Sequence, residues 1–132
     1  MIEIEARKEA ASRTARLDAV FAALADPTRR AIIERLSHSA ARVTEVAEPF
    51  QISLNAVSKH IRVLEASGVI ERHRRGRDHI LSINPHSLDE VDGWIERTRR
   101  FWEQRLDAME RLLRQLKKAH PSGPKDRKRV AR

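Results

Sequence analysis

The chain has 132 residues, of which 35% are charged, with a net charge of +8 and no cysteine. This length fits one domain with a single core, and the lack of cysteine excludes disulfides, thiolate metal sites and thiol redox switches. No apolar run approaches the roughly 18 residues that a membrane span needs, and the charged N-terminus has no apolar signal segment. We therefore expect a cytoplasmic protein with no membrane partner.

The positive charge is unevenly distributed. Residues 117–132 carry seven lysines and arginines against one aspartate, which leaves only +2 for residues 1–116. A basic chain favours an anionic partner, with nucleic acid ahead of a membrane surface. Because the first 116 residues are nearly balanced, a nucleic-acid interface has to be argued from local patterns rather than from the total charge.

Helical periodicity dominates the first half of the chain. Residues 12–24 place one apolar face at helical spacing, and a second helix follows in which Asp26 is the expected N-cap and Pro27 the first helical residue. A short third helix is expected after a turn-rich break, with Thr44 as its cap and Pro49 limiting its length. The apolar positions of the first two helices are Leu17, Val20, Phe21 and Leu24, then Ile32, Ile33 and Leu36.

The stretch ISLNAVSKHIRVLEASGVIERHRRGRDH, residues 52–79, predicts a helix followed by a hairpin. Ser53 can cap the helix and Gly68 ends it. Two short strands follow at about 69–73 and 79–83, with Gly76 in the loop between them and Asn84-Pro85 after the second strand. The expected buried stripe of the helix is Leu54, Val57, Ile61 and Leu64.

A long helix is predicted from about residue 88 to residue 118. The fold class is therefore mainly α with a small β-hairpin, in the order of a winged helix-turn-helix. We divide the chain into an N-terminal extension at 1–11, the winged helix-turn-helix domain with its terminal dimerisation helices at 12–118, and a basic disordered tail at 119–132. If the tail contacts DNA, deleting residues 121–132 should flatten the salt dependence of binding.

The helix at about 53–67 has a polar face opposite its apolar stripe, and the hairpin that follows is rich in arginine. Short polar side chains and cations on a helix suit base edges and phosphates in a major groove, and arginines on a hairpin suit phosphates or a minor groove. His60 lies at the margin of the buried face, so it either contacts a phosphate or braces the helix within the fold. The predicted DNA-binding residues are Ser53, Asn55, Ser58, Lys59, His60, Arg62, Arg72, Arg74, Arg75 and Arg77.

Two motifs resemble the ArsR/SmtB-type winged helix-turn-helix transcriptional regulators of bacteria. They are ADPTRR at residues 25–30 and AVSKHIRVLEASGVI at residues 56–70, and the resemblance extends over about residues 14–117. It implies a homodimer, paired through its first and last helices, that binds palindromic promoter DNA. It also implies that the protein is most often a repressor released by an effector.

The long last helix points to a partner helix independently of that resemblance. At a rise of about 1.5 Å per residue, the apolar stripe of this helix is longer than a small domain needs to cover its own core. The helix also carries two tryptophans and a phenylalanine, which suit contact with a second helix. A dimer would present two recognition helices to major grooves about 34 Å apart, so the operator should be a pseudo-palindrome. The predicted dimer-interface residues are Leu17, Phe21, Val91, Ile95, Trp102, Met109, Leu113 and Leu116.

The chain departs from the family's metal sensors, since it has no cysteine and residues 88–119 contain no histidine. His73 and His79 could face one another across the hairpin, but two ligands on an exposed wing make a poor site. We therefore predict no metal and no cofactor. The sequence does not identify an effector: such regulators respond to a small molecule, to another protein or to their own concentration.

Three other functions compete with that of a promoter-binding regulator. No nucleophile–base pair, phosphate loop or metal cluster supports an enzyme. RNA binding would call for exposed aromatic residues that stack on bases, whereas Trp94 and Trp102 are placed to pack. The strongest alternative is a winged-helix protein-interaction module of the transcription machinery, which a hydrophobic wing would favour and an arginine-rich wing does not.

Overall fold

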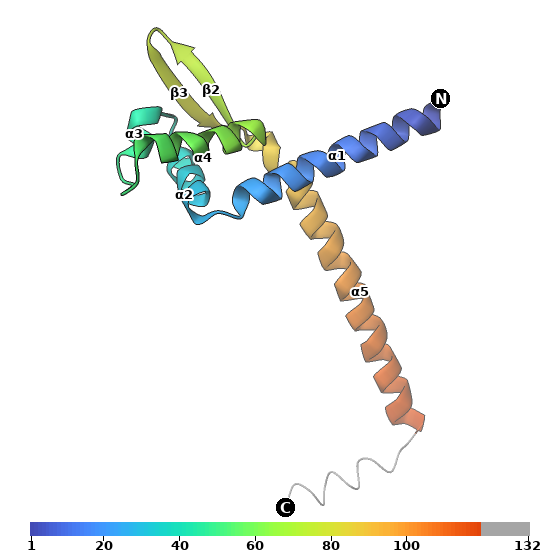
Figure 1. The fold of residues 1–132 in the computed structure, drawn as a ribbon. Helices are drawn as coiled ribbons and strands as arrows, with labels where there is room; N and C mark the ends of the chain where they lie inside the picture. Colours follow the sequence, from blue (N-terminus) through green and yellow to red (C-terminus); the bar gives the residue numbers. More distant parts are fainter. Residues whose placement is uncertain (120–132) are drawn as a thin grey trace, which may run out of the picture. The chain divides into compact units, whose positions relative to one another are not determined.

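The computed structural model describes residues 1–119, so nearly all of the predicted basic tail lies outside the described residues. Figure 1 shows the order of the elements along the chain. The elements are α1 (Ile2–Leu24), α2 (Pro27–His38), β1 (Ala41–Arg42), α3 (Val43–Ala47), α4 (Leu54–Ala66), β2 (Ile70–Arg75), β3 (Asp78–Ile83), a 3₁₀ turn (Pro85–Leu88) and α5 (Asp89–Ala119). The mainly helical winged helix-turn-helix with a small hairpin is thereby confirmed.

The chain divides into two units, residues 1–93 and residues 94 onward, and each is described by itself. The first unit contains the hydrophobic core. α4 lies at its centre, because Val57, Ile61 and Leu64 have no exposed surface. The side chains that surround them come from every element of this unit except the 3₁₀ turn: Val20, Ala23, Ile32, Leu36, Ala41, Val46, Val69, Ile70, Leu81 and Val91.

The sheet is antiparallel and has the strand order β1–β3–β2. Arg75 pairs with Asp78, so the turn that joins β2 to β3 has two central residues, Gly76 and Arg77. Gly76 has a φ of +62°, and within residues 1–119 no residue other than glycine has a positive φ. Glycine at the first central position is typical of a type II′ turn, which matches the twist of the two strands. The two-residue strand β1 was not predicted, because a segment this short has no periodicity to recognise.

The caps of α2 and α4 confirm the predicted helix starts. Asp26 accepts a hydrogen bond from the backbone N–H of Arg29 at 3.0 Å, and the Ser53 hydroxyl accepts one from the backbone N–H of Ala56 at 3.1 Å. Gly68 follows the end of α4 with a φ of +83°, the left-handed conformation expected there. The caps at Ser53 and Gly68 fix where α4 begins and ends.

Two predictions about helix starts were wrong. α1 begins at Ile2, so the helix starts ten residues before the predicted residue 12 and includes most of the predicted N-terminal extension. This segment is rich in alanine, glutamate, arginine and lysine, which favour a helix without producing an apolar period. Thr44 is not the cap of α3, because the helix begins at Val43, two residues earlier than predicted, and Arg42 occupies the cap position. The Glu45 carboxylate accepts the backbone N–H of Arg42 at 3.2 Å and so stabilises this start.

No helix within residues 1–119 has the length and apolarity required to cross a membrane. The longest, α5, carries charged residues throughout its length.

Candidate nucleic-acid interface

The exposed face of α4 carries the polar side chains that the sequence predicted for it. Asn55, Lys59 and Arg62 are exposed, and Ser58 is half-buried beside them. None of these four side chains forms a hydrogen bond or an ion pair within residues 1–119, whereas the cap residue Ser53 uses its oxygen to bind the backbone of its own helix. Their donors and acceptors are therefore available to an external ligand.

Leu54 corrects the predicted buried stripe of α4. It is the first residue of the helix, and 53% of its surface is exposed. The other three members of the stripe are fully buried. Helical spacing places Leu54 within about 60° of Val57, but the core extends to Val57 and not to the first residue of the helix. The start of α4 therefore presents an apolar side chain among polar ones.

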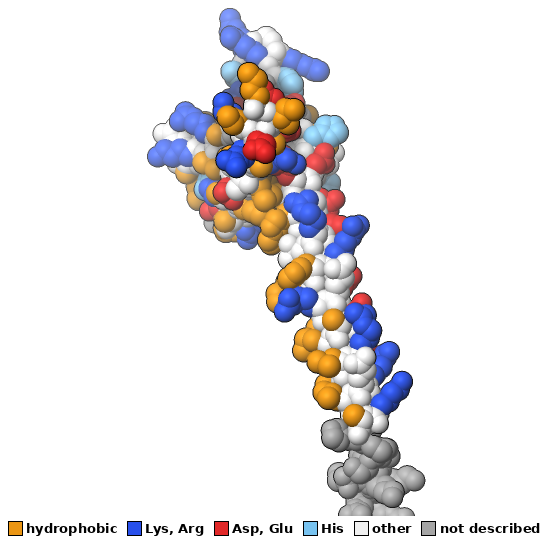
Figure 2. Space-filling view, turned by 90° about the vertical axis from the view of Figure 1, so that its right-hand side faces the viewer, with side chains coloured by type: hydrophobic (Ala, Val, Ile, Leu, Met, Phe, Trp, Pro, Cys, Tyr) orange, Lys and Arg blue, Asp and Glu red, His pale blue; other side chains and the backbone are white. Residues whose placement is uncertain are grey.

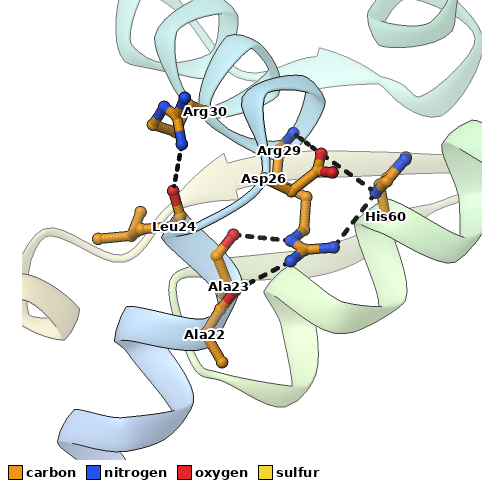
Figure 3. A network of polar contacts seen from close by, with 7 residues as sticks. All are labelled: Ala22, Ala23, Leu24, Asp26, Arg29, Arg30 and His60. Carbon is orange, nitrogen blue, oxygen red and sulfur yellow. Dashed lines mark hydrogen bonds and ion pairs between the residues drawn. The ribbon is translucent and has the colours of Figure 1, made fainter.

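His60 braces α4 within the fold (Figure 3). Its Nδ1 lies 3.4 Å from Nη1 of Arg29 and 3.7 Å from Oδ2 of Asp26. A guanidinium group can only donate, so Nδ1 accepts from Arg29 when it carries no proton and pairs with the Asp26 carboxylate when it is protonated. Of the two roles considered for His60, the geometry favours the structural one. The side chain still has 24% of its surface exposed.

The same network closes the end of α1, as Figure 3 shows. Arg29 donates from Nε to the carbonyl of Ala23 at 2.7 Å and from Nη2 to the carbonyl of Ala22 at 2.9 Å. Arg30 donates to the carbonyl of Leu24 at 2.8 Å. The last carbonyls of a helix have no partner within the helix, and cationic side chains satisfy them well. The DPTRR segment therefore joins α1, α2 and α4 at one point.

The Asp26 carboxylate is held in its charged form by this network. Its pKa lies below the usual 3.8, chiefly because the backbone N–H of Arg29 donates to it. Partial burial opposes this by raising the pKa, and positive charge at His60 and Arg29 lowers it further. Sequence reasoning found Asp26 as a cap but missed its link to His60, because residues far apart in the chain give no local signal of contact.

The wing presents arginines on both faces of a two-stranded ribbon. In the pairing of β2 with β3, Arg72 lies opposite Leu81, Arg74 opposite His79 and Arg75 opposite Asp78. Side chains alternate between the faces of a strand, so Arg75 lies on the face opposite to Arg72 and Arg74. Arg74 donates to the carbonyl of Gly76 at 3.2 Å. Arg75 and Arg77 are exposed, and their side chains have no partner within the described residues.

Arg72 differs from the other wing arginines. It forms an ion pair with Glu65 of α4, with 2.6 Å between Arg72 Nη2 and Glu65 Oε1 and a second contact from Nε. Both side chains are about 30% exposed, at 31% and 29%. This pair joins the wing to the recognition helix. The structure thus gives Arg72, predicted as a DNA contact, a bracing role within the protomer.

The two wing histidines do not face one another. Since His73 pairs with Ile80 and His79 with Arg74, they lie on opposite faces of the ribbon. Among residues 1–119, no three histidine, aspartate or glutamate side chains lie close enough together to hold a metal ion.

The described part of the second unit, residues 94–119, is helical and has one apolar side. Figure 2 shows hydrophobic side chains gathered along one side of α5 and lysine and arginine along the other. Ile95, Trp102, Met109 and Leu116 recur every seven residues, the repeat that lets one helix pair with another. The exposed fractions are 41% for Ile95, 59% for Trp102, 60% for Leu106 and Met109, 58% for Leu113 and 50% for Leu116.

The predicted dimer residues of the first unit differ in exposure. Phe21 is exposed and available to a partner chain, whereas the other two pack within the protomer. Leu17 packs against the protomer's own core, and Val91, only 9% exposed, belongs to that core. Val91 was therefore assigned wrongly to the dimer interface: it lies in the first turn of α5, where the helix contributes to the core of the first unit.

Comparison with known proteins connects this geometry with gene regulation. A helix-turn-helix domain family matches residues 24–73, which include α2 to α4 and the start of the wing. The chain is 33% identical over 96 residues to the HTH-type transcriptional regulator Rv2034 of Mycobacterium tuberculosis, covering 73% of this chain and 87% of that protein. It is 36% identical over 76 residues to the transcriptional repressor SdpR of Bacillus subtilis, covering 58% and 84%.

Solved structures agree in fold. The crystal structure of an ArsR family transcriptional regulator superposes with a TM-score of 0.65 and 41% identity, covering 68% of this chain and 93% of that one. A homodimeric winged helix-turn-helix DNA-binding domain, Mb0332 from Mycobacterium bovis, gives a TM-score of 0.53 at 19% identity and covers 71% and 84%. The second likeness concerns the fold alone.

Proposed function

The chain belongs to the ArsR/SmtB-type family of winged helix-turn-helix transcriptional regulators, and on that premise we propose that it is a homodimeric repressor of a pseudo-palindromic operator. DNA binding and transcriptional regulation follow from family membership. The dimer, the operator symmetry and the residues in contact with DNA are the parts that we propose.

The observation that supports this proposal most strongly is the contrast between the two faces of α4. One face is fully buried at Val57, Ile61 and Leu64, so the helix is rigidly seated. On the other face, Asn55 can bridge an adenine edge, Lys59 and Arg62 can reach guanine or phosphate, and Ser58 is short enough to let the helix enter the groove. None of them is engaged within the described chain.

The wing completes the interface. Arg74, Arg75 and Arg77 cluster around the turn at Gly76, and a guanidinium can bind a phosphate through two parallel hydrogen bonds. We assign these three arginines to backbone contacts, which position the protein without reading sequence. Arg72 is assigned to hold the wing against α4 through Glu65.

Dimerisation is supported by the apolar side of α5. Large exposed apolar patches mark interaction sites, and a seven-residue repeat is the spacing of a helix that pairs with a helix. The Mb0332 domain is a homodimer. We assign Ile95, Trp102, Met109, Leu113 and Leu116 of the second unit to the interface. Phe21 and Leu17 are proposed dimer contacts of the first unit.

The relatives are transcriptional regulators, and we propose that this chain also acts by binding and not by catalysis. The alternative role, a winged helix that contacts another protein, is disfavoured by the arginines on both faces of the wing. A wing used for protein contacts is expected to expose apolar side chains near its tip, and residues 71–79 contain none.

Selection from random-sequence duplexes tests the proposal. Purified protein without added metal, at physiological salt, should enrich an inverted repeat whose half-sites are centred about 34 Å apart. A single unrepeated site would contradict the dimer. Weak, steeply salt-dependent binding without an enriched motif would contradict sequence-specific recognition by the metal-free protein.

A further inference from the structure

Leu54 is an apolar side chain at the end of the recognition helix that would enter DNA. It begins α4, 53% of its surface is exposed, and it belongs neither to the hydrophobic core nor to the side chains packed against that core. A scattered exposed leucine needs no explanation in general. The position of this one does, because a recognition helix contacts bases through its N-terminal residues.

The neighbours of Leu54 are the polar side chains assigned to DNA. Ser58 lies one turn further along the same side of α4, and residues four apart on a helix are neighbours. Asn55 is adjacent in sequence and exposed. Leu54 is thus an apolar side chain at the edge of a polar, cationic surface. A ligand that matches this surface should have an apolar group beside its hydrogen-bonding groups.

The major groove of DNA offers one such group. Adenine, guanine and cytosine present donors and acceptors there, whereas thymine presents an acceptor and a C5-methyl. We propose, on the basis of the DNA-binding role proposed above, that Leu54 contacts a thymine methyl and so fixes one thymine in each operator half-site. Leu54 would then determine specificity without forming a hydrogen bond.

A protein partner fits this surface less well. Among the described residues, the only exposed large apolar side chain close to Leu54 in the sequence is Ile52, 43% exposed, and two side chains are far smaller than a stable protein interface. Ile52 also precedes the cap residue Ser53, the position at which an apolar side chain typically packs against the first turns of its own helix. Lys59 and Arg62 on the same helix favour an anionic ligand.

Replacing thymine by deoxyuridine in the selected operator tests the contact, since it removes only the methyl group. Binding of the wild type should weaken about fourfold at one thymine position in a half-site, the effect of one buried methyl. Substitution in both half-sites should multiply to about fifteenfold. Leu54→Ala should bind the thymine and uracil operators equally, and Leu54→Met, which keeps an apolar side chain, should retain most of the discrimination.

Val63→Ala is the matched control, since Val63 is an exposed apolar residue on α4, 41% exposed, on a different side of the helix. It should discriminate between the two operators as the wild type does. Circular dichroism melts of each variant confirm that it is folded.

If an operator is selected but the wild type tolerates uracil at every position, the Leu54 contact is refuted and the DNA-binding role stands. The contact is also refuted if Leu54→Ala retains the discrimination, because another residue then reads the methyl. If no operator is selected, both the contact and the proposed function fail.

Discussion

Helices α4 and α5 carry the same kind of apolar stripe, and the two stripes have opposite fates. In α4, Val57, Ile61 and Leu64 have no exposed surface. In α5, Ile95 and Trp102 are 41% and 59% exposed. Periodicity predicts that a helix has an apolar face, but it does not say whether the same chain covers that face. What remains uncovered after folding is the part available to a partner.

The largest effect should come from the uncovered stripe. Trp102→Glu places a charge at the centre of the proposed helix pair in both copies. We expect the dimer dissociation constant to rise about a hundredfold or more, because aromatic residues dominate interface energies and buried unpaired charge is costly. Sedimentation equilibrium measures the change. Arg111→Ala, on the opposite side of α5, should leave the dimer unchanged.

If Trp102→Glu leaves the dissociation constant unchanged, the α5 stripe is not the dimer interface. If it instead lowers the free energy of unfolding of the isolated protomer, measured at concentrations where the protein is monomeric, the stripe stabilises the protomer and the comparison with α4 fails.

A substitution in the buried stripe of α4 should lower the stability of the protomer and leave dimerisation unchanged. Ile61→Ala leaves a cavity in the core and should lower the free energy of unfolding by about 2–4 kcal/mol. Urea denaturation checks this. At temperatures where the variant remains folded, its dimer constant and preferred DNA sequence should match those of the wild type. A stability change below about 1 kcal/mol would show that α4 is less firmly seated than its burial implies.

The wing arginines also differ in whether the protomer itself uses them. Arg75 has no partner within residues 1–119, whereas Arg72 is paired with Glu65. Arg75→Ala should weaken operator binding about tenfold and reduce the salt dependence by roughly one ion per protomer. Arg72→Ala should mainly lower stability, by about 1 kcal/mol or less, since its ion pair is partly exposed. Equal salt slopes for both variants would refute this division.

The smallest effect concerns Asp26, whose lowered pKa stabilises the folded state when the group is charged. Asp26→Asn keeps a good capping side chain but loses the charge. The wild type should be more stable than the variant at neutral pH. This difference should diminish as the pH falls below the usual pKa of 3.8 and the folded carboxyl becomes protonated. Urea denaturation at pH 7 and pH 3 compares the two; a difference independent of pH would exclude the charge as its source.

The sequence predicted the helices, the hairpin and the caps at Asp26 and Ser53, because local hydrogen bonding and periodicity determine them. It placed Leu54 and Val91 on the wrong side of the boundary between core and surface. That boundary depends on where neighbouring elements end, which no local pattern records. The pairing of Arg72 with Glu65 and of His60 with Asp26 and Arg29 was missed for the same reason, since each joins different elements.

The central claim is that each protomer of a symmetric dimer contacts the base pairs of one operator half-site through the exposed face of its α4. Repeating the duplex selection with Asn55→Ala tests it most directly. We predict that the preferred base changes or is lost at the same position in both half-sites, while the spacing between half-sites is kept. An unchanged consensus would contradict base reading by this face, and a change in one half-site alone would contradict the symmetric dimer.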